Sequence, residues 1–222
     1  MPELLAVTSY SSLSGEFLRA GIETLKIALG AWAVSAVAGL ALAVARDAAI
    51  WPLKVVIALL TAVLRSIPQL ILLYLVFFGL PSVGIQIDAL LTAILVLGLA
   101  DAAFNAEYFR GSLLTVPYTQ REAGTSLGFS RLGTMRHIVL PQAMLYMIAP
   151  LLNSFLSLIK TATLASAIGL PEILYHSQNE IQTTGEVTRV IVVVIVIYAV
   201  VCMPLIRLTA YVERRTKERL YT

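Results

Sequence analysis

The residues of this chain that could do chemistry are a few polar and charged side chains set inside long apolar runs. Asp101 and Asn105 lie in the run 88–109, while Arg65 and Lys160 lie in two other runs. Asp101 falls about 18 Å along its helix, and Asn105 lies one turn further on the same face. Ionisable groups at such depth in an apolar helix are costly and usually serve a polar solute or pair with one another. Asp101 and Asn105 therefore predict a pathway lining or, alternatively, a hydrogen-bonded contact between helices.

The cationic residues leave a similar choice open. Arg65 and Lys160 could each bind a substrate carboxylate or neutralise an acid on a neighbouring helix. Gln69 lies one helical turn from Arg65 and is expected to share its face. The full set of predicted pathway residues is Arg65, Gln69, Asp101, Asn105, Lys160 and Thr161. Glu107 lies about 240° round the helix from Asp101, so it is expected to pair with Arg110 instead.

Several kinds of chemistry are excluded by the sequence. It contains no Gly-x-x-x-x-Gly-Lys-Ser/Thr phosphate loop, so the chain cannot hydrolyse ATP by that route. It contains no His-Glu-x-x-His pattern, and its two histidines are predicted to lie on opposite sides of a membrane. The single cysteine, Cys202, excludes an intrachain disulfide. We therefore predict no catalytic, cofactor-binding or metal-binding residue in the chain, which is not an enzyme.

The composition indicates a membrane protein. Hydrophobic residues make up 59% of the 222 residues and charged residues 13%, against about 25% charged in soluble domains. Five apolar runs are long enough to span a bilayer, near 20–45, 53–80, 88–109, 143–165 and 187–211. The sequence thus predicts an all-α polytopic protein with about five transmembrane helices in a single domain over 1–222. Pro68 is expected to kink the second helix, and the fourth is expected to break near its outer end.

Charge predicts the orientation. Lys and Arg gather in the linker 46–54, the loop 110–142 and the tail after 211, whereas the segments 81–87 and 166–186 contain neither. Because basic residues mark the cytoplasmic side, the N-terminus is predicted outside and the C-terminus in the cytoplasm. The net charge of +3 belongs to these flanks and forms no aromatic-interleaved patch of the kind that binds nucleic acid.

The cytoplasmic loop 112–141 is expected to fold into two short helices. Gln120 to Leu127 can form two helical turns, which Gly128 can end in a left-handed cap. Glu122 is expected in the first turn, where the helix dipole favours an anion. Ala123 and Gly124 are expected to leave a low ridge that lets another backbone approach closely, and the ridge is expected to fit a groove of a partner.

The second half of the loop carries further signals. Ser130 can cap a following helix. On that helix Leu132, Met135 and Val139 fall at helical spacing and are expected to rest on the rest of the protein. Pro141 then precedes the fourth apolar run.

The order of residues in this loop resembles the EAA loop of the membrane subunits of bacterial ABC importers. The matching positions are Glu122, Ala123, Gly124, Gly128, Ile138 and Pro141. In that family the loop docks onto a cytoplasmic ATPase, so the resemblance implies a type I ABC importer-like fold and an ATPase-coupling role for these residues.

Three further blocks resemble the polar amino-acid uptake group, the histidine/glutamine/arginine-type permeases. They are Arg65-Ser66-Ile67-Pro68-Gln69, Ala103 to Gly111, and Lys160-Thr161-Ala162-Thr163-Leu164. With the loop, they extend the resemblance over residues 20–212. The chain departs from the group at Ser66, Ile67, Thr119, Gly124 and Ala162, the last of which replaces an aspartate.

The resemblance implies partners and a location. Such permeases work in the bacterial inner membrane as multi-pass subunits, paired with a second identical or homologous permease. Two cytoplasmic ATPase subunits bind the ATP and magnesium, and an extracytoplasmic binding protein delivers a polar amino-acid-like substrate. The alternative is an ion-gradient-driven secondary transporter or channel for a small polar solute, which would have no use for a coupling loop.

Overall fold

The computed structural model describes the backbone of residues 2–218 and the side chains of residues 15–216. Within that part the regular structure is entirely helical, as predicted. The α-helices are α1 Pro2–Ala48, α2 Trp51–Ser66, α3 Gln69–Tyr74, α4 Ala89–Thr115, α5 Tyr118–Ser126, α6 Arg131–Thr134, α7 Leu140–Thr161, α8 Ile173–Thr184 and α9 Val187–Glu218. Shorter π or 3₁₀ segments are η1 Leu75–Gly79, η2 Leu80–Val83, η3 Met135–Val139 and η4 Ala162–Ile168.

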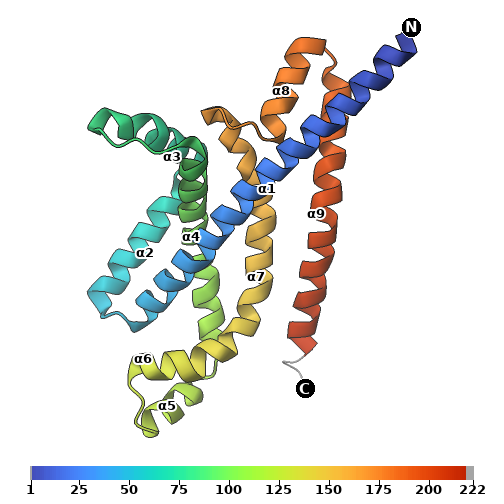
Figure 1. The fold of residues 1–222 in the computed structure, drawn as a ribbon. Helices are drawn as coiled ribbons and strands as arrows, with labels where there is room; N and C mark the ends of the chain where they lie inside the picture. The colour runs from blue at the N-terminus through green and yellow to red at the C-terminus, as the bar shows by residue number, and fades with distance from the viewer. Residues whose placement is uncertain (1, 219–222) are drawn as a thin grey trace.

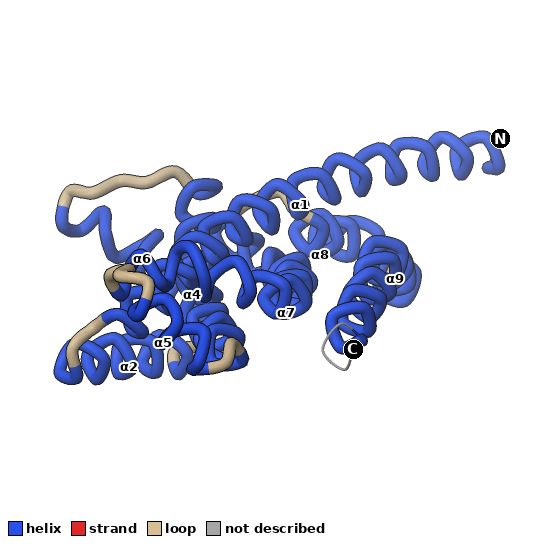
Figure 2. The backbone as a smooth tube through the Cα atoms, turned by 90° about the horizontal axis from the view of Figure 1, so that it is seen from below, coloured by secondary structure: helices blue, strands red, loops and turns tan. Residues whose placement is uncertain are grey.

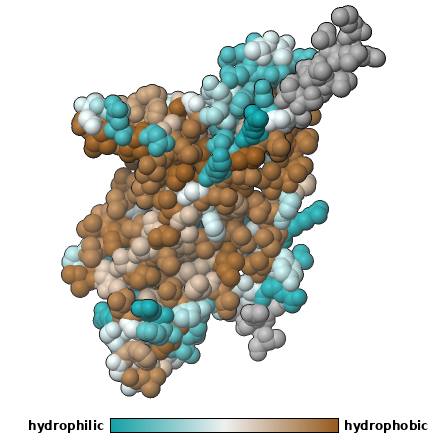
Figure 3. Space-filling model, in the orientation of Figure 1, coloured by the Kyte–Doolittle hydropathy of each residue, from teal (hydrophilic) through white to brown (hydrophobic). Residues whose placement is uncertain are grey.

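Four stretches of the described chain are long and apolar enough to cross a membrane. They are Gly15–Ala48, Ala89–Thr115, Arg131–Ile168 and Val187–Thr216. The pair Trp51–Ser66 and Gln69–Val83 supplies a fifth crossing if the two count as one span, with a bend of 96° between them. Figure 3 shows a broad hydrophobic belt between two more hydrophilic ends. The expectation of about five spans is confirmed.

The bend at Pro68 is sharper than the predicted kink. Ile67 adopts extended backbone angles of −89° and 129°, which is the conformation favoured before a proline. Gln69 then begins a new helix, α3. Arg65 and Gln69 therefore belong to two helices at a large angle, and the expectation that they share one helical face is wrong.

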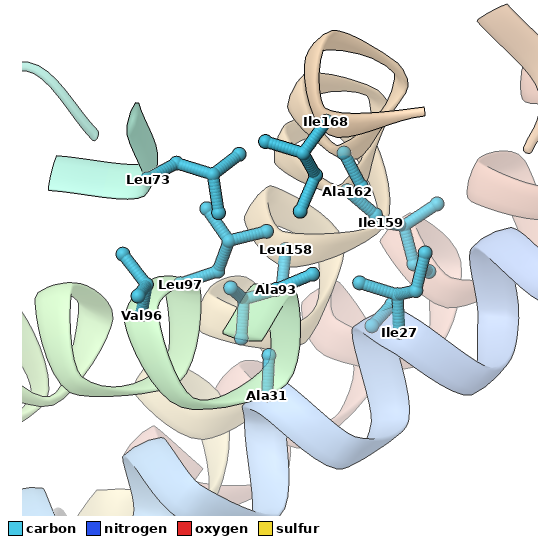
Figure 4. Packing of buried hydrophobic residues seen from close by; sticks show 12 residues of the cluster. Ile27, Ala31, Leu73, Ala93, Val96, Leu97, Leu158, Ile159, Ala162 and Ile168 are labelled. Carbon is cyan, nitrogen blue, oxygen red and sulfur yellow. The ribbon is translucent and has the colours of Figure 1, made fainter. Parts of the chain in front are cut away.

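Three helices form the centre of the molecule. Figure 1 shows α1 crossing diagonally over α4 and α7, and the main hydrophobic core joins Ile27 and Ala31 of α1 to Leu97 of α4 and Leu158 of α7. Figure 4 shows these side chains converging. The helices approach closely because small residues lie at the crossing: a Cβ added to Gly98 would lie 2.7 Å from the Ala31 carbonyl oxygen.

The two ends of this bundle carry different short helices. The α5–α6 hairpin lies at one end, and α8 lies at the other, beside the outer parts of α1 and α9 (Figure 1). Figure 2, viewed from below, shows α1 extending well beyond the rest of the bundle. Within the apolar windows, 61% of α4 is buried inside the molecule but only 11% of α9. The α9 helix thus presents most of its surface to lipid or to another subunit.

Candidate functional site

The α5 helix and its cap form the first half of the cytoplasmic loop. Pro117 precedes the helix, and Gly128 ends it with a φ of +83°. Two backbone bonds close the turn, from the Gly128 amide to the Thr125 carbonyl (3.0 Å) and from the Phe129 amide to the Gly124 carbonyl (3.1 Å). Such caps satisfy the last carbonyls of a helix and favour glycine at the left-handed position. The predicted cap at Gly128 is confirmed.

The second half of the loop begins at Ser130, whose side chain accepts a hydrogen bond from the Gly133 amide at 3.1 Å. Met135 and Val139 are buried against the ends of α1 and α4, as expected. Leu132 is 64% exposed, so the expectation that it rests on the protein is wrong. Leu132 lies in the first turn of α6, before the chain reaches the hydrophobic core.

Gly124 has a role that the sequence did not reveal. It is buried, and a Cβ added there would lie 2.6 Å from Cγ2 of Thr134 and 2.9 Å from Cδ1 of Ile138. The glycine therefore lets α5 pack against the α6–η3 segment. The expectation that Gly124 offers an outward ridge to a partner is wrong, because its face of the helix turns inward. Ile138 is half-buried beside it.

The outward face of the loop carries Glu122 and Ala123, both exposed. Glu122 is the fifth residue of α5, so the expected position in the first turn is wrong. Pro141 is exposed where α7 begins. The loop also exposes four large apolar side chains: Leu132 (64% exposed), discussed above, and three that sequence reasoning missed, Tyr118 (71%), Leu127 (75%) and Phe129 (41%). The sequence signal for these side chains was the presence of large apolar residues in an otherwise polar loop.

Ion pairs lie where this loop meets the membrane helices. The Arg121 guanidinium contacts the Asp47 carboxylate of α1 at 2.8 Å and donates to the Leu113 carbonyl of α4 at 3.3 Å. Glu107 bridges Arg110 at 2.9 Å and also pairs with Arg46, which confirms the predicted Glu107–Arg110 pair. Glu107 thus joins two arginines in a small partly buried network between α1 and α4, and ion pairs in a network count for more than isolated surface pairs.

Asp101 and Asn105 lie at the crossing of α1, α4 and α7. Oδ2 of Asp101 accepts hydrogen bonds from Ser35 of α1 (2.6 Å) and Ser154 of α7 (2.5 Å). The Asn105 amide donates to Oγ of both serines at 2.7 Å and 2.9 Å. Asn105 is 0% exposed and Asp101 7%. In this chain the arrangement favours the alternative considered above, a hydrogen-bonded contact between helices.

Another face of α7 carries polar side chains that point outward. Asn153, Ser157 and Lys160 are exposed and follow an i, i+4, i+7 spacing, which places them on one side of the helix. Thr161 is half-buried, and its hydroxyl donates to the Ser157 carbonyl at 2.9 Å. We call Asn153, Ser157, Lys160 and Thr161 the α7 stripe. Asn153 and Ser157 were missed from the sequence, although their spacing from Lys160 could have revealed them.

The remaining predicted residues lie at the bend between α2 and α3. Arg65 is exposed at the end of α2, and its guanidinium carbon lies 5.2 Å from the centroid of the Phe104 ring, within cation–π range. Gln69 is half-buried at the start of α3. The predicted pathway residues thus fall into an accessible group and an enclosed pair, Asp101 and Asn105.

Comparison with known proteins decides the family. The family described as the binding-protein-dependent transport system inner membrane component matches residues 35–218, a range that includes the α5–α6 loop and the α7 stripe. The chain belongs to this family. It is therefore a membrane permease subunit of an ABC importer, and ATP hydrolysis takes place in separate subunits, which leaves the secondary-transporter alternative without support.

Individual relatives agree over most of the chain. The probable amino-acid ABC transporter permease protein YckA of Bacillus subtilis (strain 168) is 36% identical over 159 residues, or 70% of this chain and 69% of YckA. The probable glutamine ABC transporter permease protein GlnM of the same organism is 32% identical over 195 residues, 88% of this chain and 90% of GlnM.

Solved structures agree with the fold. A chain in the crystal structure of an amino acid ABC transporter with histidines superposes with a TM-score of 0.83 at 27% identity, covering 94% of this chain and 97% of that one. A chain of the inward-facing MetNI methionine ABC transporter superposes with a TM-score of 0.69 at 22% identity, covering 90% and 98% of the two chains. The second likeness bears on the fold alone.

Proposed function

We propose that this permease forms half of the pathway by which a bacterial inner-membrane importer takes up a polar amino acid or amino-acid derivative. The observation that carries the proposal is the α7 stripe. An exposed lysine and asparagine on an apolar helix are costly against lipid and are expected to face a polar passage. The amino-acid and glutamine permeases among the relatives support the substrate class.

In a single chain the α7 stripe is exposed, so another subunit must cover it to enclose a passage. We infer that a second permease, identical or homologous, faces it and that two cytoplasmic ATPase subunits bind ATP and magnesium beneath the pair. An extracytoplasmic binding protein delivers the substrate at the other side. The family description supports the need for a binding protein.

Within the passage, the Lys160 ammonium is suited to bind the carboxylate shared by all amino acids, since charge-assisted hydrogen bonds are the strong ones. Thr161, Asn153 and Ser157 offer neutral polar groups beside it. Arg65 and Gln69 are proposed to line the passage at the bend between α2 and α3. Asp101 and Asn105 are proposed to support the passage without lining it, by fixing α7 against α1 and α4.

The loop couples this passage to the ATPase. Glu122 and Ala123 form the docking face together with the exposed apolar side chains Tyr118, Leu127, Phe129 and Leu132, which would enter a groove of the ATPase. Gly124 and Ile138 keep the two short helices packed, while the Gly128 cap sets the turn between them. Pro141 leads directly into α7, so displacement of the docked loop would move the stripe.

The test measures uptake of radiolabelled amino acids by proteoliposomes that contain the complete complex. Lys160→Met should raise the KM for substrate about tenfold or more, because a hydrogen bond to a charged group contributes about 1.5–3 kcal/mol. ATPase co-purification should not change. Lys54→Met, which removes an exposed lysine on α2, is the matched control. Unchanged uptake kinetics in Lys160→Met would remove this residue from the passage.

A further inference from the structure

A large apolar groove lies near the predicted outer end of the molecule, between α1 and α9. Its volume is about 480 Å³, within the range of about 300–1,000 Å³ that is usual for small-molecule sites. Ile22 and Leu25 of α1 form one wall, and Val193 and Ile197 of α9 form the other. Ile159 of α7 contributes to its lining. The walls thus offer an apolar ligand a long hydrophobic surface.

The groove opens on a different side of the molecule from the α7 stripe. At about 100° per residue, Ile159 lies about 130° round α7 from the centre of the face that carries Asn153, Ser157 and Lys160. A second permease that closes the stripe therefore does not fill the groove by the same contact. The residues along the groove belong to the outer halves of two candidate membrane spans, Gly15–Ala48 and Val187–Thr216. On the predicted orientation, the groove therefore lies toward the outer surface of the membrane.

Charged groups stand at one end of the groove. Glu180 of α8 and Glu186 and Arg189 at the start of α9 contribute to its lining. The Arg189 guanidinium lies 2.5 Å from the Glu186 carboxylate. Carboxylates accept hydrogen bonds from an ammonium group, and a guanidinium binds phosphate. An apolar trough with both signs of charge at its outer end matches an amphiphile whose headgroup carries both a phosphate and an ammonium.

We propose that this groove binds an acyl chain of an outer-leaflet phospholipid, with a zwitterionic headgroup at Glu180, Glu186 and Arg189. The bound chain fills the space between the outer halves of α1 and α9. It thereby supports α9, of which little is buried within the chain itself. An ordered acyl chain that contacts both helices supplies dispersion contacts that would be missing if the groove were empty.

The test fills the groove and counts bound lipid. Gly21 contributes to the lining, and a Cβ added there meets no atom within 4 Å, so Gly21→Leu should occupy the groove without distorting α1. Gly15 lies on the same helix, is exposed, has equally open surroundings and does not line the groove. Gly15→Leu is therefore a matched control for the added side chain and for the change in helix propensity.

The complete permease–ATPase complex is purified in mild detergent, supplied with phosphatidylethanolamine and analysed by native mass spectrometry. The unaltered complex and Gly15→Leu should retain one phosphatidylethanolamine per permease, and Gly21→Leu should lose at least tenfold of that retention. Equal retention in both variants would overturn the proposal. So would a thiol cross-link from Val193→Cys to a second permease or to the binding protein.

The headgroup is tested separately, with phosphatidylglycerol, which lacks the ammonium. The unaltered complex should prefer phosphatidylethanolamine, and the double variant Glu180→Gln with Glu186→Gln should lose that preference while it still retains lipid. If the unaltered complex retains both lipids equally, the assignment of the headgroup to these carboxylates is wrong.

Discussion

Two groups of polar side chains lie among the apolar helices of this permease, and they differ in what surrounds them. Asp101 and Asn105 are enclosed at the crossing of three helices and bonded to Ser35 and Ser154. The α7 stripe stands on the surface of the chain. Both groups consist of ordinary polar residues in apolar helices, so residue type alone does not separate them. The difference teaches that a polar residue in a membrane helix can hold helices together or serve a solute, and that exposure decides between these roles.

The substitution Asp101→Ala tests most directly whether the enclosed pair holds the helices together. Loss of the carboxylate leaves the buried hydroxyl donors of Ser35 and Ser154 without their acceptor, which should destabilise the bundle by about 1–3 kcal/mol. We expect a lower thermal unfolding temperature, measured on the purified complex, and less assembled complex, measured as its yield from membranes. Lys160→Met should leave both quantities unchanged.

The opposite result would reverse the two roles. If Asp101→Ala assembled with normal stability but altered the substrate concentration dependence of uptake, the enclosed pair would belong to the passage. Asp101→Asn, which keeps an acceptor oxygen, should lie between the two and shows whether the charge or the hydrogen bond matters.

The same contrast between enclosed and exposed positions extends to the cytoplasmic loop, with a smaller effect. Gly124→Ala gains up to about 1 kcal/mol of helix propensity but crowds Thr134 at 2.6 Å, and overpacking usually costs about 1–3 kcal/mol. We expect a net loss of about 1 kcal/mol in loop stability and weaker substrate-stimulated ATP hydrolysis. Amide hydrogen exchange across α5 and ATPase assays on the full complex measure the two effects.

A second substitution separates packing from docking. The Thr134 hydroxyl has no hydrogen-bond partner within the described part of the chain, so Thr134→Ala removes the two nearest obstructing atoms without breaking a bond and leaves only the flexible end of Ile138 close by. The double variant Gly124→Ala with Thr134→Ala should regain coupling. Leu127→Ser, at an exposed position, should instead weaken ATPase co-purification while loop exchange stays normal. Failure of the double variant to recover would show that Gly124 is needed for something other than space.

The smallest expected effect concerns Glu172, at the start of α8. Its side chain is 0% exposed and accepts the amides of Leu174 (3.0 Å) and Tyr175 (2.8 Å), while burial raises the pKa of its carboxyl group to about 7 from 4.5. The folded state therefore holds this proton more tightly than the unfolded state. The resulting stability is fully present below about pH 4.5 and is lost as pH rises through about 7.

Hydrogen exchange of α8 between pH 5.5 and 8, corrected for intrinsic rates, should show falling protection as pH rises. Glu172→Gln keeps one acceptor oxygen at this position but cannot ionise, so the protection of α8 in this variant should not depend on pH through residue 172. Another ionisable group in this part of the bundle is His176 of α8, whose backbone amide donates to the Glu172 carbonyl at 3.1 Å. A pH dependence that survives in Glu172→Gln would therefore come from another group such as His176 and would contradict the assignment to Glu172.

Local structure was predictable from the sequence where a residue type restricts the backbone conformation at or next to its own position. Pro68 ends α2 because the preceding residue is driven into extended conformation, and Gly128 and Ser130 cap their helices as their residue types favour. The number of apolar runs and the family resemblance were equally accessible. Sequence periodicity could also have found Asn153 and Ser157.

The rest depends on contacts between residues far apart in the chain. Gly124 faces inward because Thr134 and Ile138 pack on it, and no pattern near Gly124 indicates this. Asp101 is enclosed because Ser35, 66 residues earlier, and Ser154, 53 residues later, meet it. The groove between α1 and α9 likewise arises only when the two ends of the chain come together.

The bond between Arg121 and Asp47 has a mechanical consequence. It joins the α5–α6 loop to the cytoplasmic end of α1, which from Gly15 to Ala48 is 34 residues long, or about 51 Å. With that end as fulcrum, a tilt of about 5° would carry Gly15 through about 4 Å of arc. The first helix can thus transmit a small change of tilt at its cytoplasmic end to the opposite surface of the membrane as a shift of several ångströms.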